Sequence, residues 1–266
     1  MNYRLISIHE ELGACIDLVQ KIPHDVDIIC GIPRHGIIPA AIVAEVLGLP
    51  LTAPASPMWF TKNANHRQQH YPPTIAIVDD SIGTATTMNA AREIVQNDFP
   101  GSKILTAVVY TSEKTKDLID IYAHAYPKDT KIMFHSQFMH SPWERPIGYD
   151  MDGILCEDWR DGWDYSDFFV NAKPYRIPAY KIDYIVTARM EEYRKPTIAW
   201  LDRYGVDYSH LIMRKDQNEE HGAYKSRICT TNGIKIFIES VRGQAKTIGR
   251  TPGVMCVHYE SGELFQ

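Results

Sequence analysis

The chain has 266 residues, of which 44% are hydrophobic and 23% charged, and its formal net charge is −5. This length suits two domains of the usual size of about 100–150 residues, and the composition excludes a disordered or collagen-like chain. The acidic balance gives no general attraction for nucleic acid or an anionic membrane, so we expect neither as a partner.

Short apolar runs that end in polar or glycine turns alternate with longer periodic stretches along the chain. This pattern is typical of parallel strands joined by crossover helices, and it predicts the α/β class, as two Rossmann-like domains with parallel sheets. The predicted strands are residues 26–30, 74–78, 104–110, 146–149, 184–186 and 234–238, and the predicted helices are residues 39–47 and 196–203.

The domain boundary is predicted from a lapse in periodicity around residues 135–145, before a new strand begins. We expect the first domain over residues 1–138, a linker over about 139–145 and the second domain over 146–266. Residues 54–73 are rich in Lys, Asn, His, Arg and Gln, and are long enough for a functional loop.

Cysteines and apolar runs indicate the compartment. The five cysteines form an odd set without a C-x-x-C pair, which favours neither a disulfide framework nor a zinc site. No apolar run approaches the roughly 18 residues needed to cross a bilayer, and the N-terminal residues lack a signal-peptide core. We therefore expect a soluble cytoplasmic protein without an integral membrane segment, of open oligomeric state.

Two acidic residues, Asp79 and Asp80, follow the apolar run 75–78 and precede a small, hydroxyl-rich turn that opens a helix. Backbone N–H groups at a helix start bind phosphate, and a carboxylate pair accepts hydrogen bonds from ribose hydroxyls. The residues therefore fit a sugar-phosphate site, and they equally fit a strand that ends in a solvated acidic turn.

This run of four apolar residues, two acids and a small-residue loop closely resembles the binding signature of type I phosphoribosyltransferases. A second mark of that family is Gly31-Ile-Pro-Arg-His-Gly36, placed as its pyrophosphate loop would be. The resemblance implies phosphoribosyl diphosphate as donor, with Asp79 and Asp80 on the ribose 2′- and 3′-hydroxyls. It also implies pyrophosphate contacts, with magnesium, from Arg34, His35 and Gly36, and 5-phosphate contacts from Ser81, Gly83, Thr84, Ala85, Thr86 and Thr87.

The chain departs from that family at Gly83, where the family usually has Ser, Thr, Ala, Val or Asp. In the family a flexible loop closes over the donor and excludes the water that would capture an oxocarbenium-like transition state. Residues 54–73 stand in that place. Lys62, His66 and Arg67 are therefore candidate pyrophosphate contacts, and each equally fits a solvated loop charge.

The second half carries Asp-x-Asp-Gly at residues 150–153, directly after a predicted strand, so that two carboxylates can face a common metal ion. Acidic turns are common, and the match alone is weak. It is followed in order by Thr187-Ala-Arg189, by Lys225 and by Phe237-Ile-Glu-Ser240. These four motifs in this order resemble the haloacid dehalogenase-like (HAD-like) phosphatases.

That resemblance implies a role for each motif. Asp150 is the implied nucleophile that forms an aspartyl phosphate, and Asp152 is the acid that protonates the leaving oxygen and then activates water. Thr187 and Lys225 would stabilise the phosphoryl oxygens, and Arg189 would contact the substrate. Magnesium would be bound by Asp150, by the backbone carbonyl of Asp152 and by Glu239.

Two features of the pattern stay open. Lys215 is a second candidate for the lysine, because it also follows the second motif, and either lysine fits an exposed helix charge. Ser240 stands where the family usually has a second acid, which indicates weaker metal binding or an inactive phosphatase.

The motif spacing leaves no room for a large cap domain, since 37 positions separate Asp150 from Thr187 and 52 separate Thr187 from Glu239. A capless site is open and suits a phosphate carried by a bulky group. The first interval holds an aromatic run that fits a flap and packing, or a substrate platform: Trp159, Trp163, Tyr165, Phe168 and Phe169.

Together the two resemblances predict a bifunctional enzyme. One domain would transfer 5-phosphoribosyl to an acceptor with inversion, and the other would remove the 5-phosphate to leave a β-ribofuranosyl group. Little sequence is left to enclose a nucleobase, which favours a sugar hydroxyl in surface-polysaccharide biosynthesis as acceptor. The alternatives are a nucleobase or other heterocycle, in salvage or a stress response, and a non-catalytic sensor of phosphoribosyl diphosphate.

Overall fold

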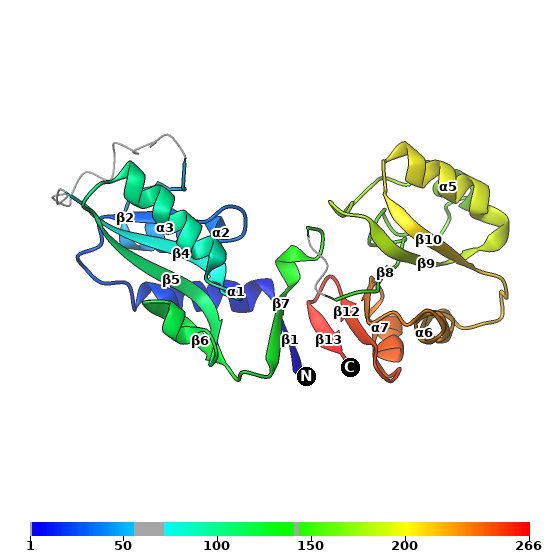
Figure 1. Ribbon diagram of the computed structural model, residues 1–266. Coiled ribbons are helices and arrows are strands. Elements are labelled where there is room, and N and C mark those ends of the chain that lie inside the picture. The colour runs from blue at the N-terminus through cyan, green and yellow to red at the C-terminus, as the bar shows by residue number, and fades with distance from the viewer. Residues whose placement is uncertain (1, 56–71, 141–143) are drawn as a thin grey trace. The chain divides into compact units, whose positions relative to one another are not determined.

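The structure is a computed structural model that describes residues 2–55, 72–140 and 144–266. The chain divides into two compact units, each with its own largely parallel sheet (Figure 1). Unit 1 comprises His9–Lys131 with the first two residues of the chain, and unit 2 comprises Tyr3–Ile8 with Ile132–Gln266.

Unit 1 contains a five-stranded sheet in the order β3-β2-β4-β5-β6, in which every neighbouring pair is parallel. The predicted strands of the first half are confirmed, because their apolar runs are buried on both faces of this sheet. The strands are β2 (Ile28–Gly31), β3 (Leu51–Thr52), β4 (Thr74–Ser81), β5 (Lys103–Ser112) and β6 (Ile121–Tyr126).

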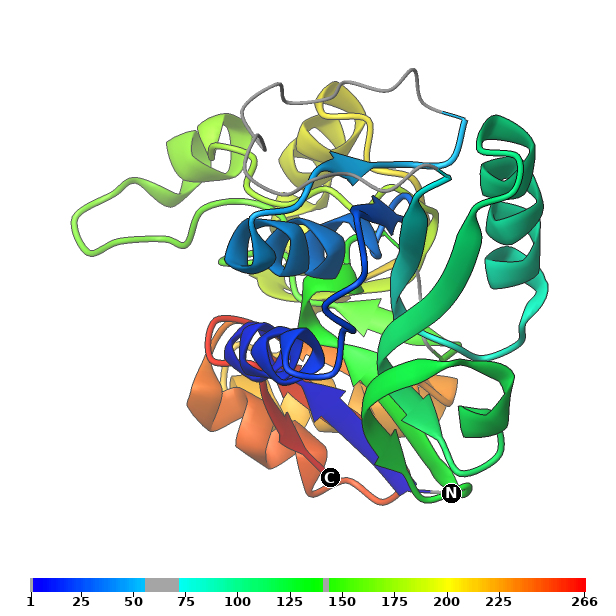
Figure 2. The ribbon, with the colours of Figure 1, turned by 90° about the vertical axis from the view of Figure 1, so that its left-hand side faces the viewer.

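Helices cover both faces of the unit 1 sheet, as parallel connections require. Ile75 and Ile77 of β4 pack in one buried cluster with Met88 and Val95 of α3. Figure 2 shows α2 and α3 on opposite sides of the strands. The helices are α1 (Ile8–Val19), α2 (Ile37–Leu47) and α3 (Thr86–Asp98), followed by a 3₁₀ turn at Lys116–Leu118.

Unit 2 contains a six-stranded sheet in the order β10-β9-β8-β11-β12-β13, with only β13 antiparallel to its neighbour. The short central strand β8 is completely buried between β9 and β11. The strands are β8 (Ile147–Tyr149), β9 (Ile182–Met190), β10 (Tyr208–Arg214), β11 (Ile236–Glu239), β12 (Met255–His258) and β13 (Glu263–Phe265).

The helices of unit 2 also cover both faces of its sheet. Trp200 of α5 packs in one buried cluster with Ile185, and Tyr224 of α6 packs in another with the next strand residue, Val186. Figure 1 shows α5 on one side of the sheet and α6 and α7 on the other. The helices are α4 (Tyr165–Asn171), α5 (Arg194–Arg203), α6 (His221–Asn232) and α7 (Arg242–Gly249), with 3₁₀ turns at His135–Gln137 and Glu191–Tyr193.

The boundary between the units differs from the predicted linker over 139–145. Met133 and Phe138 are fully buried in the same cluster as Ile147 and Tyr149, so the chain has already entered the second core before the predicted linker. The N-terminal strand β1 (Asn2–Ile6) pairs with β7 (Thr130–Phe134) in a separate two-stranded sheet. Periodicity could not show this, because the core of unit 2 is assembled from both ends of the sequence.

One strand end also differs from the prediction. β4 was predicted to end at Val78 but continues to Ser81, so Asp79 and Asp80 belong to the strand itself. Asp79 is still paired in register with Val108 of β5. Among the described residues, no helix has both the length and the apolar character that a membrane crossing requires.

Candidate active sites

The two signatures of unit 1 meet at the carboxyl ends of β2 and β4. These strands are parallel neighbours with Gly31 in register with Val78, and the Ile32 N–H donates to the Val78 carbonyl at 2.9 Å. Gly36 lies so close to β4 that a Cβ placed on it would come within 2.7 Å of the Asp79 Oδ1 atom. The loop before α2 and the acidic pair therefore form one site.

The two carboxylates at this site differ in exposure. Asp80 is buried and accepts from the Ser81 N–H at 2.6 Å, whereas Asp79 is half-buried and accepts from the Asp80 N–H at 2.9 Å. Burial and the negative charge of Asp80 raise the pKa of Asp79 to about 8. A group that brings positive charge or hydrogen-bond donors to Asp79 would relieve this cost.

The turn after the acidic pair leads into α3. Helix α3 begins at Thr86 after Ala85, and no side chain caps its first N–H groups. The turn is exposed at Gly83, Thr84 and Thr86, so its backbone N–H groups and threonine hydroxyls face solvent. The Thr84 and Thr86 hydroxyls lie 3.3 Å apart. Such a helix start is suited to bind a phosphate.

The remaining residues predicted to contact the pyrophosphate group lie in two segments of the first half of the sequence. Arg34 is exposed and His35 half-buried in the loop between β2 and α2, where the peptide bond from Pro33 to Arg34 is cis. Lys62 and Arg67 lie outside the described residues, as does His66. Their predicted pyrophosphate contacts stay predictions.

The second site lies at the carboxyl ends of β8, β9 and β11, which are adjacent in the sheet of unit 2. The Lys225 Nζ atom is 2.7 Å from Asp150 Oδ2 and 2.7 Å from Glu239 Oε2, and its side chain is 1% exposed. Of the two candidate lysines, Lys225 contacts the predicted nucleophile and Lys215 is exposed, and the phosphoryl contact of Lys225 stays a prediction.

The charges of this triad depend on one another. Burial and the Glu239 charge raise the pKa of Asp150 well above its usual value, and Lys225 opposes them. Burial alone would lower the pKa of Lys225, but Asp150 and Glu239 outweigh it and raise that pKa. The ammonium therefore stays protonated and keeps two carboxylates together in the interior.

Asp152 is positioned by an ion pair with Arg189. The Arg189 Nη2 and Nε atoms donate to Asp152 Oδ1 at 2.5 and 3.0 Å, and Nη1 donates to Thr197 Oγ1 at 3.4 Å. The guanidinium also lies over the Phe169 ring at 4.5 Å. Arg189 thus holds the predicted acid and also lines the pocket, and its predicted contact with substrate stays a prediction.

Thr187 is fully buried behind the pocket, where its Oγ1 accepts from the Arg189 N–H at 3.2 Å. The neighbouring residues Ala188 and Arg189 line the pocket instead. The predicted contact from Thr187 to phosphoryl oxygens stays a prediction.

The oxygens around Ser240 fit a hard cation. Ser240 Oγ donates to the Asp152 carbonyl at 2.9 Å and is 3.5 Å from Asp150 Oδ2, so a hydroxyl, a carbonyl and a carboxylate converge. The described residues hold no group of three or more His, Cys, Asp or Glu placed to bind a metal. Magnesium needs no such group, since it keeps several waters and takes one or two protein carboxylates together with substrate phosphate.

Glu239 makes contacts that favour a role other than metal ligand. Its Oε1 accepts from the Ser240 and Val241 N–H groups at 2.9 and 3.0 Å, and its Oε2 accepts from Lys225. The side chain is fully buried. The predicted metal contact stays a prediction, since Glu239 Oε1 also lies 3.4 Å from the Ser240 hydroxyl that contacts the Asp152 carbonyl.

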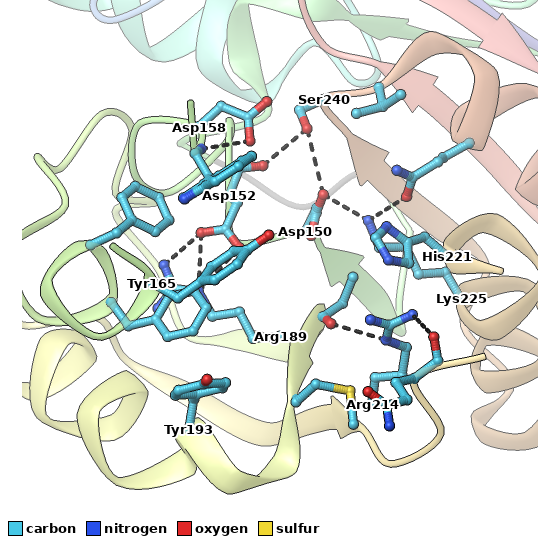
Figure 3. Close-up of a pocket in the computed structure, with 18 of the residues that line it drawn as sticks. Asp150, Asp152, Asp158, Tyr165, Arg189, Tyr193, Arg214, His221, Lys225 and Ser240 are labelled. Carbon is cyan, nitrogen blue, oxygen red and sulfur yellow. Dashed lines mark hydrogen bonds and ion pairs between the residues drawn. The ribbon is translucent and has the colours of Figure 1, made fainter. Parts of the chain in front are cut away.

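Asp150, Lys225 and Ser240 line a pocket of about 420 Å³, whereas Glu239 and Thr187 do not. Figure 3 shows Asp150 and Ser240 at one end, Tyr165 and Tyr193 on one side, and Arg214, His221 and Lys225 on the other. The remaining lining residues include Asp152, Asp158, Trp159, Phe168, Phe169, Arg189 and Gln244.

Sequence reasoning missed several residues of this pocket. Arg214 ends β10, beside the strand that carries Thr187, and His221 lies one helical turn before Lys225 on α6. Both positions could have been found from element order and helical spacing. Gln244, which accepts from Lys225 at 3.0 Å, carries no comparable signal.

Comparison with known proteins gives weak similarities. No family model and no curated protein matches the chain. A purine phosphoribosyltransferase from Pyrococcus horikoshii is 22% identical with a TM-score of 0.41, over 50% of this chain and 93% of that chain. The xanthine-guanine-hypoxanthine phosphoribosyltransferase of Helicobacter pylori is 15% identical with a TM-score of 0.41, over 52% and 93%. These similarities lie in the N-terminal part of the chain.

Gly36→Ala should disrupt the donor site. The added methyl group would lie 2.7 Å from Asp79 Oδ1 and from the Val78 carbonyl, so the loop or the strand end must move. We expect binding of phosphoribosyl diphosphate to weaken at least tenfold in isothermal titration. Gly13→Ala is the control, since nothing lies within 4 Å of its added methyl group and it belongs to no predicted site, and it should bind like the wild type. Equal affinities for both variants would contradict the close packing of this loop.

Asp79→Asn should stabilise the protein at alkaline pH. The folded-state pKa of Asp79 is raised to about 8, so its ionisation costs stability as the pH rises from about 4 to 8. The melting temperature of the variant should exceed that of the wild type by a few degrees at pH 8, with the difference vanishing near pH 4. Asp117→Asn, at an exposed carboxylate, should show no such trend. A variant less stable than the wild type at pH 8 would overturn this expectation.

Proposed function

We propose that the protein is a bifunctional enzyme that transfers 5-phosphoribosyl from phosphoribosyl diphosphate to an acceptor and then removes the 5-phosphate. The observation that carries the proposal is the assembly of Asp150, Lys225 and Glu239 from three separate motifs into one buried triad beside Asp152. The packing of Gly36 against Asp79 supports the transferase half in the same way.

In the transfer step, Asp79 and Asp80 hold the ribose hydroxyls, while the start of α3 binds the 5-phosphate. The bond from ribose C1 to pyrophosphate breaks and the acceptor attacks the opposite face, which gives a β-linkage. Charge accumulates on the ribose ring in the transition state, and the nearby carboxylates stabilise it electrostatically.

In the hydrolysis step, an Asp150 oxygen attacks phosphorus and the ester bond breaks, with the leaving oxygen protonated by Asp152. Asp152 then takes a proton from water, which attacks the phosphoryl group and releases Asp150. Lys225 fixes Asp150 for attack and balances charge, and Arg189 fixes Asp152. Both positions are set before substrate enters, which lowers the reorganisation cost.

Magnesium is the proposed cofactor, and the oxygens of Asp150, of the Asp152 carbonyl and of Ser240 would hold it. When bound, it supplies charge stabilisation to the transferred phosphoryl group. Ser240 contributes no negative charge, so binding would be weaker than with two carboxylates.

The chemical class of the acceptor is inferred from motif spacing and from the connection between β8 and β9. The spacing argument favours a sugar hydroxyl of a surface-polysaccharide intermediate, and a nucleobase or other heterocycle is the second candidate. Between β8 and β9 all residues are described, and α4 is the one helix there, which agrees with a site that lacks a cap domain. A sensor without turnover is not favoured, since binding alone needs no lysine-fixed nucleophile.

The experiment that tests the proposal is mass spectrometry of reactions with the protein, magnesium, phosphoribosyl diphosphate and a panel of acceptors. A gain of the phosphoribosyl mass, followed by loss of phosphate, is expected for one acceptor class. Pyrophosphate release and phosphate release are followed in parallel. Tight donor binding with neither release would show a sensor instead.

Asp150→Asn should separate the two activities. The variant lacks the nucleophile, so phosphate release should fall at least a thousandfold while pyrophosphate release persists, and phosphorylated product should accumulate. Asp161→Asn, at an exposed carboxylate of the same unit, is the control and should retain both activities. Loss of pyrophosphate release in Asp150→Asn alone would show that the two sites are not independent.

Ser240 and Glu239 variants should respond differently to magnesium. Ser240→Asp adds a carboxylate beside Asp150 and should lower the half-saturating magnesium concentration about tenfold, while Ser240→Ala should raise it. Glu239→Gln removes a partner of the buried Lys225 and should lose activity at every magnesium concentration. Restoration of Glu239→Gln by high magnesium would instead favour Glu239 as the metal ligand.

A further inference from the structure

The side of the unit 2 pocket opposite His221 is formed by aromatic rings (Figure 3). They divide into two layers by burial. Phe168 and Phe169 of α4 are buried and belong to the core of unit 2, whereas Tyr165 is 50% exposed. The buried pair is explained by packing, whereas Trp159 packs only partly against the same core, and both Trp159 and Tyr165 also line the pocket.

The outer layer is a stack of two rings. Trp159 and Tyr165 lie with ring centroids 4.8 Å apart and an interplanar angle of 13°. Both residues line the same pocket as Asp150 and Asp152. An aromatic pair that stays partly in water beside a reactive carboxylate offers a flat surface to a third ring.

Local contacts fix this stack in place. The Trp159 Nε1–H donates to the Trp163 carbonyl at 3.2 Å, and the Asp164 side chain accepts from the Asp167 N–H at 2.9 Å, which caps α4. Tyr165 is the first residue of α4 and packs against Phe169, with ring centroids 5.8 Å apart. Phe169 in turn lies under the Arg189 guanidinium that holds Asp152. The stack is therefore tied to the catalytic end of the pocket.

We propose that Trp159 and Tyr165 stack on a planar heterocycle carried at C1 of the ribosyl 5-phosphate, so that the phosphatase substrate is nucleotide-like. This inference rests on the proposed function. In such a substrate one furanose ring separates the phosphate from the heterocycle, which places the heterocycle in the pocket when the phosphate is at Asp150. A volume of about 420 Å³ is in the range of pockets that enclose a small molecule, roughly 300–1,000 Å³.

The proposal selects one of the two acceptor classes. A sugar acceptor would leave a second sugar ring, which can place only C–H groups against the aromatic pair and has no planar π face to stack on it. A heterocyclic acceptor uses it, since base stacking on aromatic side chains contributes substantially to binding whatever the base. The pocket stays open to a bulky substrate, because the two rings form one of its sides and do not close its entrance.

The test compares two substrates that differ in the group at C1. These are adenosine 5′-monophosphate and methyl β-D-ribofuranoside 5-phosphate, each assayed for phosphate release with magnesium. We expect kcat/KM to favour the nucleotide by about 5- to 150-fold, the range that base stacking supplies. The double variant Trp159→Ala with Tyr165→Ala should bring this ratio close to one through a raised KM for the nucleotide.

Two single variants serve as controls. Tyr165→Phe keeps the stacking face and should keep the ratio. Tyr175→Ala removes a tyrosine that is also 50% exposed but does not line the pocket, and it should keep the ratio as well. Loss of preference in Tyr175→Ala would show a general effect of removing a surface ring and overturn the assignment.

The outcomes separate this inference from the proposed function. Equal kcat/KM for both substrates in the wild type overturns the stack while the phosphatase stands. Hydrolysis of neither substrate overturns the phosphatase, and the stack is then judged by isothermal titration of Asp150→Asn with both compounds. Tighter binding of the nucleotide, lost in the double variant, supports it, and equal binding rejects it.

Discussion

The buried ammonium of Lys225 is the interaction on which the second unit depends. It joins Asp150 at the end of β8 to Glu239 at the end of β11, and no charge of the three is stable in the interior without the others. Removing one member of such a set typically costs about 3–5 kcal/mol, because it leaves a buried charge unpaired. Lys225 lies on α6, and the start of this helix is capped by Glu220, which accepts from the Gly222 and Ala223 N–H groups.

The first unit also holds a strand-end carboxylate whose pKa is raised by burial. At Asp79 the cost of burial is not balanced within the strand end, and its pKa is raised to about 8. Asp150 in the second site shares this effect, because burial and Glu239 raise its pKa and the ion pair with Lys225 only opposes the rise. Carboxylates with perturbed pKa values cluster at functional sites, so both strand ends are candidates for binding or catalysis.

Motif order allowed much of the second site to be predicted from the sequence. Asp150, Lys225 and Glu239 follow from four motifs in sequence order and from the rule that parallel strands end at one edge of a sheet. The partner of Arg189 could not be predicted, since it depends on how the loop after β8 brings Asp152 to β9. The contact of Glu239 with Lys225 could not be predicted either, because the sequence around a strand-end carboxylate does not show whether the side chain faces a metal ion or a lysine.

The aromatic stack changes where specificity is placed in the proposed reaction. The sequence leaves little chain in unit 1 to enclose an acceptor, whereas unit 2 presents a fixed stack of Trp159 and Tyr165 in the pocket that Asp150 also lines. Removal of the phosphate is the step that commits the product, so selection there need not be matched by selection in the transfer. A transferase that accepts several acceptors, followed by a phosphatase that releases only planar ones, would give a specific product from an open first site.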